Sequence, residues 1–215
     1  MPKEWYLIKD GYFSGFEQEL FDDAQLAFED LLYISPEAFS VTVNREKQER
    51  AIVQSIPHAD KRSILFKEDA INWGDLIGFD GGEWLVIDKP INNQSYSKSR
   101  IHFCNSNLHI QKTVGERIEY DPLNNPYKVG EKIIEFNQPC IIESMTSLDN
   151  KDSKPINLPS GDMYITIQNT NHELISIGEK FNMFGDVYRI SGIDRSRIYG
   201  EKGVITLITV RDIKE

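Results

Sequence analysis

Residues 74–87 read GDLIGFDGGEWLVI and residues 178–191 read GEKFNMFGDVYRIS, and the two stretches align without a gap at an offset of 104 residues. In both, a glycine and an acid precede a strand pattern, a glycine-containing turn follows, and an aromatic residue, Trp84 or Tyr188, begins the return. A glycine in such a turn supplies the positive φ that a tight hairpin requires. The aromatic residue and the aliphatic residue two positions later lie on one face of a strand. The two stretches therefore predict an internal repeat of a small β-barrel.

Further strand patterns surround both copies. From residue 41 onward, short apolar and β-branched runs recur with turn residues between them, at the spacing that is typical of sandwiches and small barrels. The main runs are residues 41–43, 51–55, 63–66, 100–104, 108–111, 132–136, 140–145, 163–168 and 204–210. The pattern predicts a mainly β protein with two tandem small antiparallel β-barrel or sandwich units.

The first forty residues differ from the rest. Between Ser14 and Leu32, apolar residues recur at spacings of three and four, which predicts an amphipathic helix that ends before Pro36. Residues 1–40 hold nine acids against Lys3 and Lys9, so this segment contributes −7 to a net charge of −10. The acids are expected on the face opposite the apolar stripe, as a solvated surface, as a surface that docks a basic partner, or as the lining of a passage that must not bind DNA tightly. The candidate docking residues are Glu17, Glu19, Asp22, Asp23, Glu29 and Asp30.

Two polar stretches are candidates for loops. Residues 147–160 (SLDNKDSKPINLPS) have the composition of a linker, which predicts a helical segment over 1–40, a barrel over 41–146, the linker itself, and a smaller barrel over 161–215. Residues 89–99 (KPINNQSYSKS) form a polar connection that is longer than a usual hairpin turn. The residues of this connection that could line an interface or channel are Lys89, Asn92, Asn93, Gln94, Tyr96 and Lys98.

Sequence patterns for catalysis are weak. The chain has no GxxxxGK[ST], GxGxxG, GxSxG or HExxH motif, and neighbouring acids such as Glu119 with Asp121 fall in turn-like stretches. His102, Cys104, His109 and Cys140 include no CxxC or HxxxH pair, so we expect ordinary barrel residues with reduced thiols rather than a zinc site. We expect no catalytic residue, no metal and no cofactor.

Binding of nucleic acid is a possible alternative. Tyr188, Arg189, Arg195, Arg197 and Tyr199 interleave basic and aromatic side chains, as single-strand binding surfaces do. Arginines at strand edges also serve only to block edge pairing. The net charge of −10 opposes tight binding of a phosphate backbone.

The stretch from Gly74 to Pro122 resembles the head-closure, or stopper, neck proteins of tailed bacteriophages. The resemblance rests on a strand after Gly-Asp, on Trp84-Leu85-Val86, on the polar loop with Tyr96-Ser97-Lys98, and on Ile101–Leu108 with its Cys-Asn-x-x-Leu element. Residues 163–207 are similar to the barrel of the same group, through 163–171, 177–181, 187–194 and 203–207. The acidic helix is not part of the pattern.

The resemblance implies a structural protein of the virion without enzymatic activity. Such proteins form a ring at the head–tail junction between the portal or adaptor and the tail, close the DNA channel, and provide a site for tail attachment. The implied partners are further copies of the chain, portal or adaptor proteins, tail proteins and the passing genomic DNA. With no run of about 18 apolar residues and no signal-peptide pattern, we expect no membrane partner and assembly in the host cytoplasm. The alternatives are a tail or baseplate component and an OB-like nucleic-acid-binding module.

Overall fold

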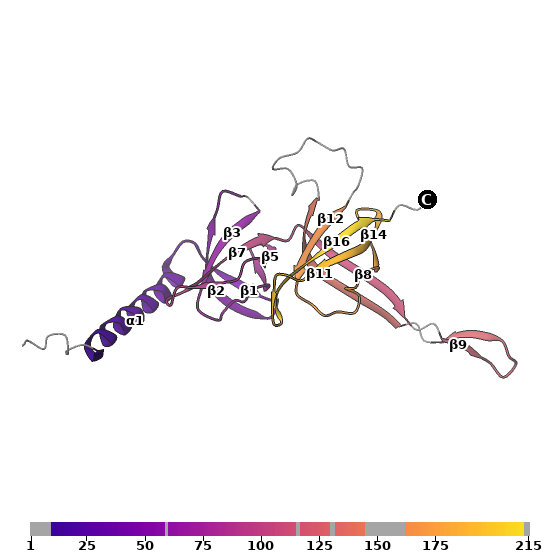
Figure 1. Cartoon of the computed structure of the whole chain (residues 1–215), viewed down its shortest axis with the longest axis horizontal. Helices are drawn as coiled ribbons and strands as arrows, with labels where there is room; N and C mark the ends of the chain where they lie inside the picture. The colour runs from indigo at the N-terminus through magenta and orange to yellow at the C-terminus, as the bar shows by residue number, and fades with distance from the viewer. Residues whose placement is uncertain (1–9, 59, 115–116, 130–131, 145–161, 213–215) are drawn as a thin grey trace, which may run out of the picture. The chain divides into compact units, whose positions relative to one another are not determined.

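The structure, a computed structural model, describes residues 10–58, 60–114, 117–129, 132–144 and 162–212. The chain divides into two compact units, Met1–Phe103 and Cys104–Glu215, and each contains one large antiparallel sheet (Figure 1). The mainly β prediction, with an N-terminal helix and two barrel-like units in tandem, is confirmed.

The first unit is a closed barrel preceded by a helix. Its sheet has the order β3-β2-β1-β4-β5-β7, and the pairing of β3 with β7 closes the circle. A core of aliphatic side chains with Phe66 and Trp84 fills the inside. Its elements are α1 (Asp10–Ile34), β1 (Ala38–Val43), β2 (Lys47–Ser55), β3 (Lys61–Phe66), β4 (Leu76–Phe79), β5 (Gly82–Val86), β6 (Ile91–Asn92) and β7 (Ser97–Phe103).

The second unit has its own sheet and its own core. The sheet order is β13-β14-β16-β12-β11-β8, and Phe136, Phe181 and Tyr188 pack inside it among aliphatic residues. Its elements are β8 (Ser106–Val114), β11 (Lys132–Ser144), β12 (Met163–Gln168), β13 (Lys180–Met183), β14 (Asp186–Asp194), β15 (Ile198–Tyr199) and β16 (Lys202–Arg211). Between β8 and β11 in the chain, β9 (Arg117–Tyr120) and β10 (Pro126–Val129) form a separate two-stranded sheet, here called the inserted hairpin.

The predicted repeat is confirmed at the level of single hydrogen bonds. The bounds of β13 and the start of β14 follow those of β4 and β5 at the offset of 104 residues. The amide of Gly74 donates to the carbonyl of Val86 at 3.0 Å, and the amide of Gly178 donates to that of Ile190 at 2.8 Å. Both glycines have a positive φ, 87° and 95°. The two hairpins therefore share their backbone conformation as well as their sequence pattern.

The repeat extends to the whole units. In chain order, β1, β2, β3, β4, β5 and β7 of the first barrel have the same hydrogen-bonded neighbours as β8, β11, β12, β13, β14 and β16 of the second, except that β1 pairs with β4 whereas no pairing joins β8 to β13 in the described part of the chain. Each unit also has a two-residue strand, β6 or β15, that pairs with the last strand of its barrel. The two units are thus two versions of one six-stranded design.

The division between the units differs from the predicted one. Residues 106–144 belong to the second sheet, because β11 pairs with β8 on one edge and with β12 on the other. The structure therefore divides the chain after Phe103, and the predicted barrel over 41–146 joins strands of two units. The predicted linker at 147–160 lies outside the described residues, between two strands that pair with each other. A long polar connection inside a hairpin has the same composition as an interdomain linker, so composition misplaced the boundary.

Candidate interaction surfaces

The polar stretch 89–99 is a hairpin rather than a long loop. Ile91 and Asn92 form β6 and pair with the start of β7, and the amide of Asn93 donates to the carbonyl of Tyr96 at 2.9 Å. The amide of Gln94 donates to Asn92 Oδ1 at 2.7 Å. The pairing signal is only two residues long, so the sequence pattern did not predict it.

The candidate residues of this stretch have two different roles. Tyr96 is half-buried and stacks on Phe28 of α1 with ring centroids 5.2 Å apart, so it fastens the helix to the barrel. Asn92 Nδ2 donates to Glu68 Oε1. Lys89, Asn93, Gln94 and Lys98 are exposed. Their role in lining a channel stays a prediction.

The end of α1 is anchored on the first barrel. Phe28 and Leu32 are 5% and 1% exposed and pack with Ile52, while Lys67 Nζ lies 2.6 Å from Glu29 Oε1. Arg50 Nε donates to the Leu32 carbonyl at 2.7 Å. This bond satisfies one of the carbonyls that a helix C-terminus leaves without a partner, in a last turn that has no basic residue of its own. The anchor thus fixes where α1 leaves the barrel.

The candidate acids of α1 lie mostly on its exposed surface. Glu19, Asp22, Asp23 and Asp30 are exposed, and Glu29 is the member that pairs with Lys67. The side chain of Glu17 is outside the described part of the chain. Large apolar side chains accompany the acids: Leu20 is 52% exposed, Leu26 62% and Leu31 45%.

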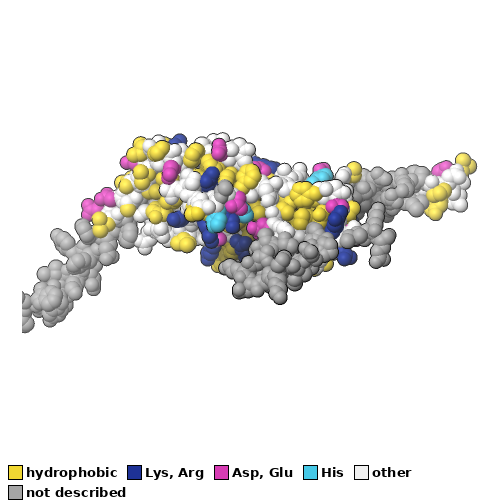
Figure 2. Space-filling view, turned by 90° about the horizontal axis from the view of Figure 1, so that it is seen from above, with side chains coloured by type: hydrophobic (Ala, Val, Ile, Leu, Met, Phe, Trp, Pro, Cys, Tyr) yellow, Lys and Arg dark blue, Asp and Glu magenta, His cyan; other side chains and the backbone are white. Residues whose placement is uncertain are grey.

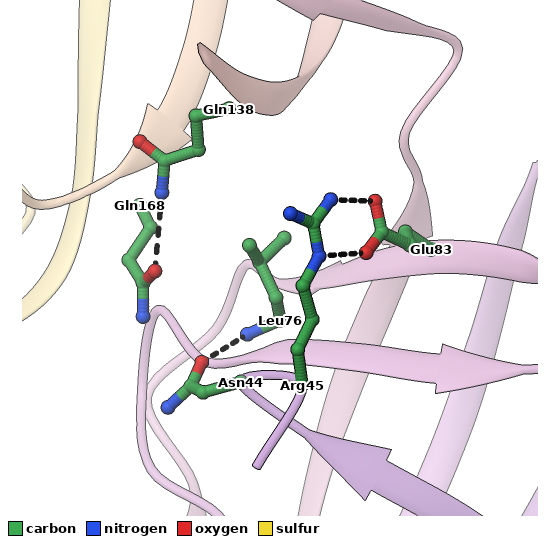
Figure 3. Close-up of polar contacts among 6 residues, drawn as sticks. All are labelled: Asn44, Arg45, Leu76, Glu83, Gln138 and Gln168. Atoms are coloured by element: carbon green, nitrogen blue, oxygen red, sulfur yellow. Dashed lines mark hydrogen bonds and ion pairs between the residues drawn. The ribbon is translucent and has the colours of Figure 1, made fainter. Parts of the chain in front are cut away.

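The inserted hairpin is a surface that the sequence pattern did not identify. It replaces the tight β1–β2 turn of the first barrel, where Asn44 Oδ1 accepts from the Leu76 amide at 2.9 Å and Arg45 makes two bonds to Glu83, 2.6 and 2.8 Å long (Figure 3). In the second barrel, Gln138 of β11 donates to Gln168 of β12 at 3.1 Å (Figure 3).

The tip of the inserted hairpin is apolar and ordered by its own carboxylate. Tyr120 is 63% exposed and Leu123 is 82% exposed, and Figure 2 shows hydrophobic side chains at the surface of this tip. Asp121 Oδ1 accepts from the amides of Leu123 and Asn125 at 2.9 and 2.8 Å. The bonds from Asn125 hold the pKa of Asp121 below its ordinary value. The turn residues of DPLNNP were the signal that could have identified this hairpin.

The basic and aromatic residues of the second unit do not form one binding face. Tyr188 is 5% exposed and stacks on Phe181 in the core, whereas its neighbour Arg189 points outward. Arg195 and Tyr199 are exposed. A platform for stacking bases would need both aromatic rings at the surface. The residues of this stretch are therefore split between core and surface.

The histidines and cysteines are placed apart. Buried His102 lies with Nε2 2.7 Å from Asp60 Oδ2, and His109 Nε2 lies 2.6 Å from Glu135 Oε1. Cys140 is buried and unbonded to Cys104, and burial raises the pKa of its thiol to about 12. Within the described residues, no group of three or more His, Cys, Asp or Glu side chains could hold a metal ion.

Grooves on the described surface lie beside α1 and along one seam of the second sheet. One of about 390 Å³ lies between the end of α1 and β1–β2, and it is lined by Leu32, Tyr33, Ser40, Gln48, Glu49, Arg50 and Lys67. The other, of about 310 Å³, lies along the seam between β8 and β13 and is lined by His109, Gln111, Lys180, Phe181, Asn182 and Val187. In the first barrel the equivalent strands β1 and β4 are paired, whereas in the described part of the second an ion pair between Lys112 and Glu179 crosses the seam.

Among the described helices, none is long and apolar enough to span a membrane.

Comparison with known proteins places both units in one family. The model of the YomX N-terminal domain matches residues 12–103, and that of the YomX C-terminal domain matches residues 108–209, which agrees with the division after Phe103. The chain is 31% identical over 160 residues to the SPbeta prophage-derived uncharacterized protein YomX of Bacillus subtilis (strain 168), and the alignment covers 72% of each protein. No solved structure matches. The chain therefore belongs to the YomX family.

Proposed function

We propose that the chain is a non-enzymatic structural protein of a tailed-phage virion, which assembles as a ring in the neck between the portal or adaptor and the tail. The related B. subtilis protein is described as prophage-derived, which supports a phage origin. The neck-protein resemblance of residues 74–122 and 163–207 supports the finer assignment. In this role the protein closes the DNA channel and provides a site for tail attachment.

The observation that carries this proposal is the placement of exposed apolar side chains on two elements outside the barrel sheets. Leu20, Leu26 and Leu31 of α1 and Tyr120 and Leu123 of the inserted hairpin are all 45% exposed or more. Meanwhile the two barrel interiors are filled by their own side chains. Exposed large apolar side chains gathered on protruding elements are typical of surfaces that other proteins cover. A ring subunit needs such surfaces for its neighbours and for the components above and below it.

The charge distribution is compatible with contact between the ring and passing DNA. The net charge is −10, and the described barrel surfaces bear many paired ions, such as Arg45 with Glu83 and Arg211 with Asp186. A channel wall of this kind attracts few phosphates, so DNA can move past it without being held. We expect weak binding of purified protein to DNA at physiological salt.

Electron cryomicroscopy of virions from the source phage tests the proposal, with a small tag at the C-terminus of the chain to identify its density. Symmetric copies at the head–tail junction are the expected result. Copies at the tail tip or baseplate would instead assign the protein to the tail. Absence of the chain from purified virions would rule out a virion role, and strong, salt-dependent binding to single-stranded DNA would then favour the nucleic-acid alternative.

A further inference from the structure

The N-terminal part of the described helix extends beyond its anchor. Phe28 and Leu32 pack on the barrel, whereas the residues from Glu19 to Ala27 whose side chains are described are all exposed. Helical stability in proteins comes mainly from tertiary packing of an apolar face, and short helices are marginal in water without it. The exposed turns of α1 are thus the part of the first unit that most needs an outside partner.

The exposed turns have an ordered apolar stripe. Leu20, Ala24, Ala27 and Leu31 follow one another at spacings of four, three and four, so they share one side of the helix. The buried anchor residues Phe28 and Leu32 lie next to this stripe. One wide apolar sector is therefore divided in two: one part covers the barrel, and the other faces away from it.

The charged residues of the helix are all acidic. Residues 10–34 contain no Lys or Arg. They contain seven acids: Asp10, Glu17, Glu19, Asp22, Asp23, Glu29 and Asp30. Of these, Glu29 forms an ion pair with Lys67, the residue that directly follows β3. The helix thus concentrates most of the net charge of the molecule beside an uncovered apolar stripe.

We propose that α1 docks by this stripe in an apolar groove of a different protein, one whose groove is flanked by Lys and Arg side chains. The mode is that of an amphipathic helix in a groove, where apolar residues at helical spacing are the anchors and flanking charges set the orientation. A second copy of the chain is a poor occupant. Pairing two α1 helices would bring together fourteen acids, seven from each, with no cation from either helix.

Docking of α1 adds to the neck-ring function the chemistry of one partner surface. It depends on the neck-ring function only for the location of the partner at the head–tail junction. Photo-crosslinking in cells that produce the phage tests it directly. The full chain is made with p-benzoylphenylalanine in place of Leu20 or, separately, of Ala24. The control places the same group at Ile91, which is 68% exposed on β6 of the same unit.

The expected result is a set of cross-links from both helix positions to one segment of one other protein, identified by peptide mass spectrometry, with Lys or Arg residues near the cross-linked site. The triple variant Asp22→Asn, Asp23→Asn and Asp30→Asn should lower the yield several-fold, with the helix content in circular dichroism unchanged. The Ile91 position should not give these cross-links.

Cross-links to a second copy of the chain, or only to its own barrel, would overturn the proposal. So would a yield that the triple variant leaves unchanged, or a cross-linked segment without basic residues, or no cross-links at all. The outcome is separate from that of the neck-ring proposal. If the cross-linked partner is basic but absent from virions, the neck position is refuted and the docking of α1 stands. If the chain is found in virions but gives no such cross-links, the neck position stands and the docking of α1 is refuted.

Discussion

At the residue scale, Phe184 combines a bulky side chain with a left-handed backbone conformation. It has φ 53° in the β13–β14 turn, and its ring is 70% exposed. The first copy of the repeat has Asp80 at the equivalent position, with φ 52°. Positive φ in such turns favours Asn, Asp and Gly, whose side chains tolerate the left-handed region. Phe184 therefore lowers stability without gaining the burial of its ring.

The internal repeat predicts the outcome of exchange at this position. Phe184→Asn should raise the free energy of unfolding by about 1 kcal/mol, since the αL conformation costs a bulky side chain roughly that amount and costs Asn, whose short polar side chain can hydrogen-bond locally, much less. Chemical denaturation measures the change. Asp80→Phe, the reciprocal substitution, should lower stability by a similar amount. A loss of stability in Phe184→Asn would mean that the ring makes stabilising contacts within its own chain.

A second residue-scale prediction concerns Cys140, which is 0% exposed. Burial raises the pKa of its thiol from 9.0 to about 12, so the folded protein disfavours the thiolate. A folded pKa above the unfolded value contributes stability that is fully present below pH 9 and is lost as the pH rises toward 12. Cys140→Ala should therefore reduce the loss of stability between these pH values, as measured by thermal unfolding across the range. At pH 8, iodoacetamide should modify Cys140 only after denaturant is added, and modification in the native protein would contradict its burial.

At the element scale, helix α1 is fastened by a small set of contacts. Leu32 is 1% exposed, and Leu32→Ala should cost about 3 kcal/mol at its site. Because Leu32 packs in the small cluster with Phe28 and Ile52, separate from the barrel core, we expect release of the helix rather than unfolding of the barrel. Hydrogen exchange should show faster exchange for α1 and unchanged protection in β1–β5. Leu26→Ala, at a 62% exposed position, is the matched control and should change exchange neither in α1 nor in β1–β5. Faster exchange throughout the barrel in Leu32→Ala would show that the helix and the barrel do not unfold separately.

The elements also show where sequence patterns suffice and where they do not. The α1 stripe and the 74–87 repeat were predicted, because each has a periodicity that a single side-chain face imposes on many residues. The sequence pattern predicts a loop at 89–99, whereas the structure has a hairpin, because β6 is only two residues long and Tyr96 stacks on Phe28 of α1. The inserted hairpin was missed for a different reason. Its two strands are four residues each and form a sheet of their own, which is too short for the long alternation that marks the strands of the barrels.

At the scale of the whole molecule, the repeat decides how the chain is divided. The repeat predicted two barrels, yet the composition of 147–160 put the boundary inside the second one. The pairing of β11 with both β8 and β12 shows why local composition was misleading, because strands distant in the chain share one sheet. Matching the order of all six strands of one barrel to the other places the boundary after Phe103. Alignment of all six strands of a repeat therefore predicts the domain limits better than alignment of its most similar hairpin alone.

This division predicts which fragments of the chain fold. Residues 1–103 contain all six strands of the first barrel and its core, so this fragment should fold alone and unfold in one cooperative transition. Residues 161–215, the smaller barrel of the composition-based division, should not. That fragment keeps β12, β13, β14 and β16 but loses β8 and β11, so it leaves β12 without its partner β11 and the core without Leu108, Ile110 and Phe136. Circular dichroism during thermal unfolding compares the two fragments at equal concentration. A cooperative transition for 161–215 but not for 1–103 would contradict the division, because a barrel folds as a unit only when every strand of its sheet is present.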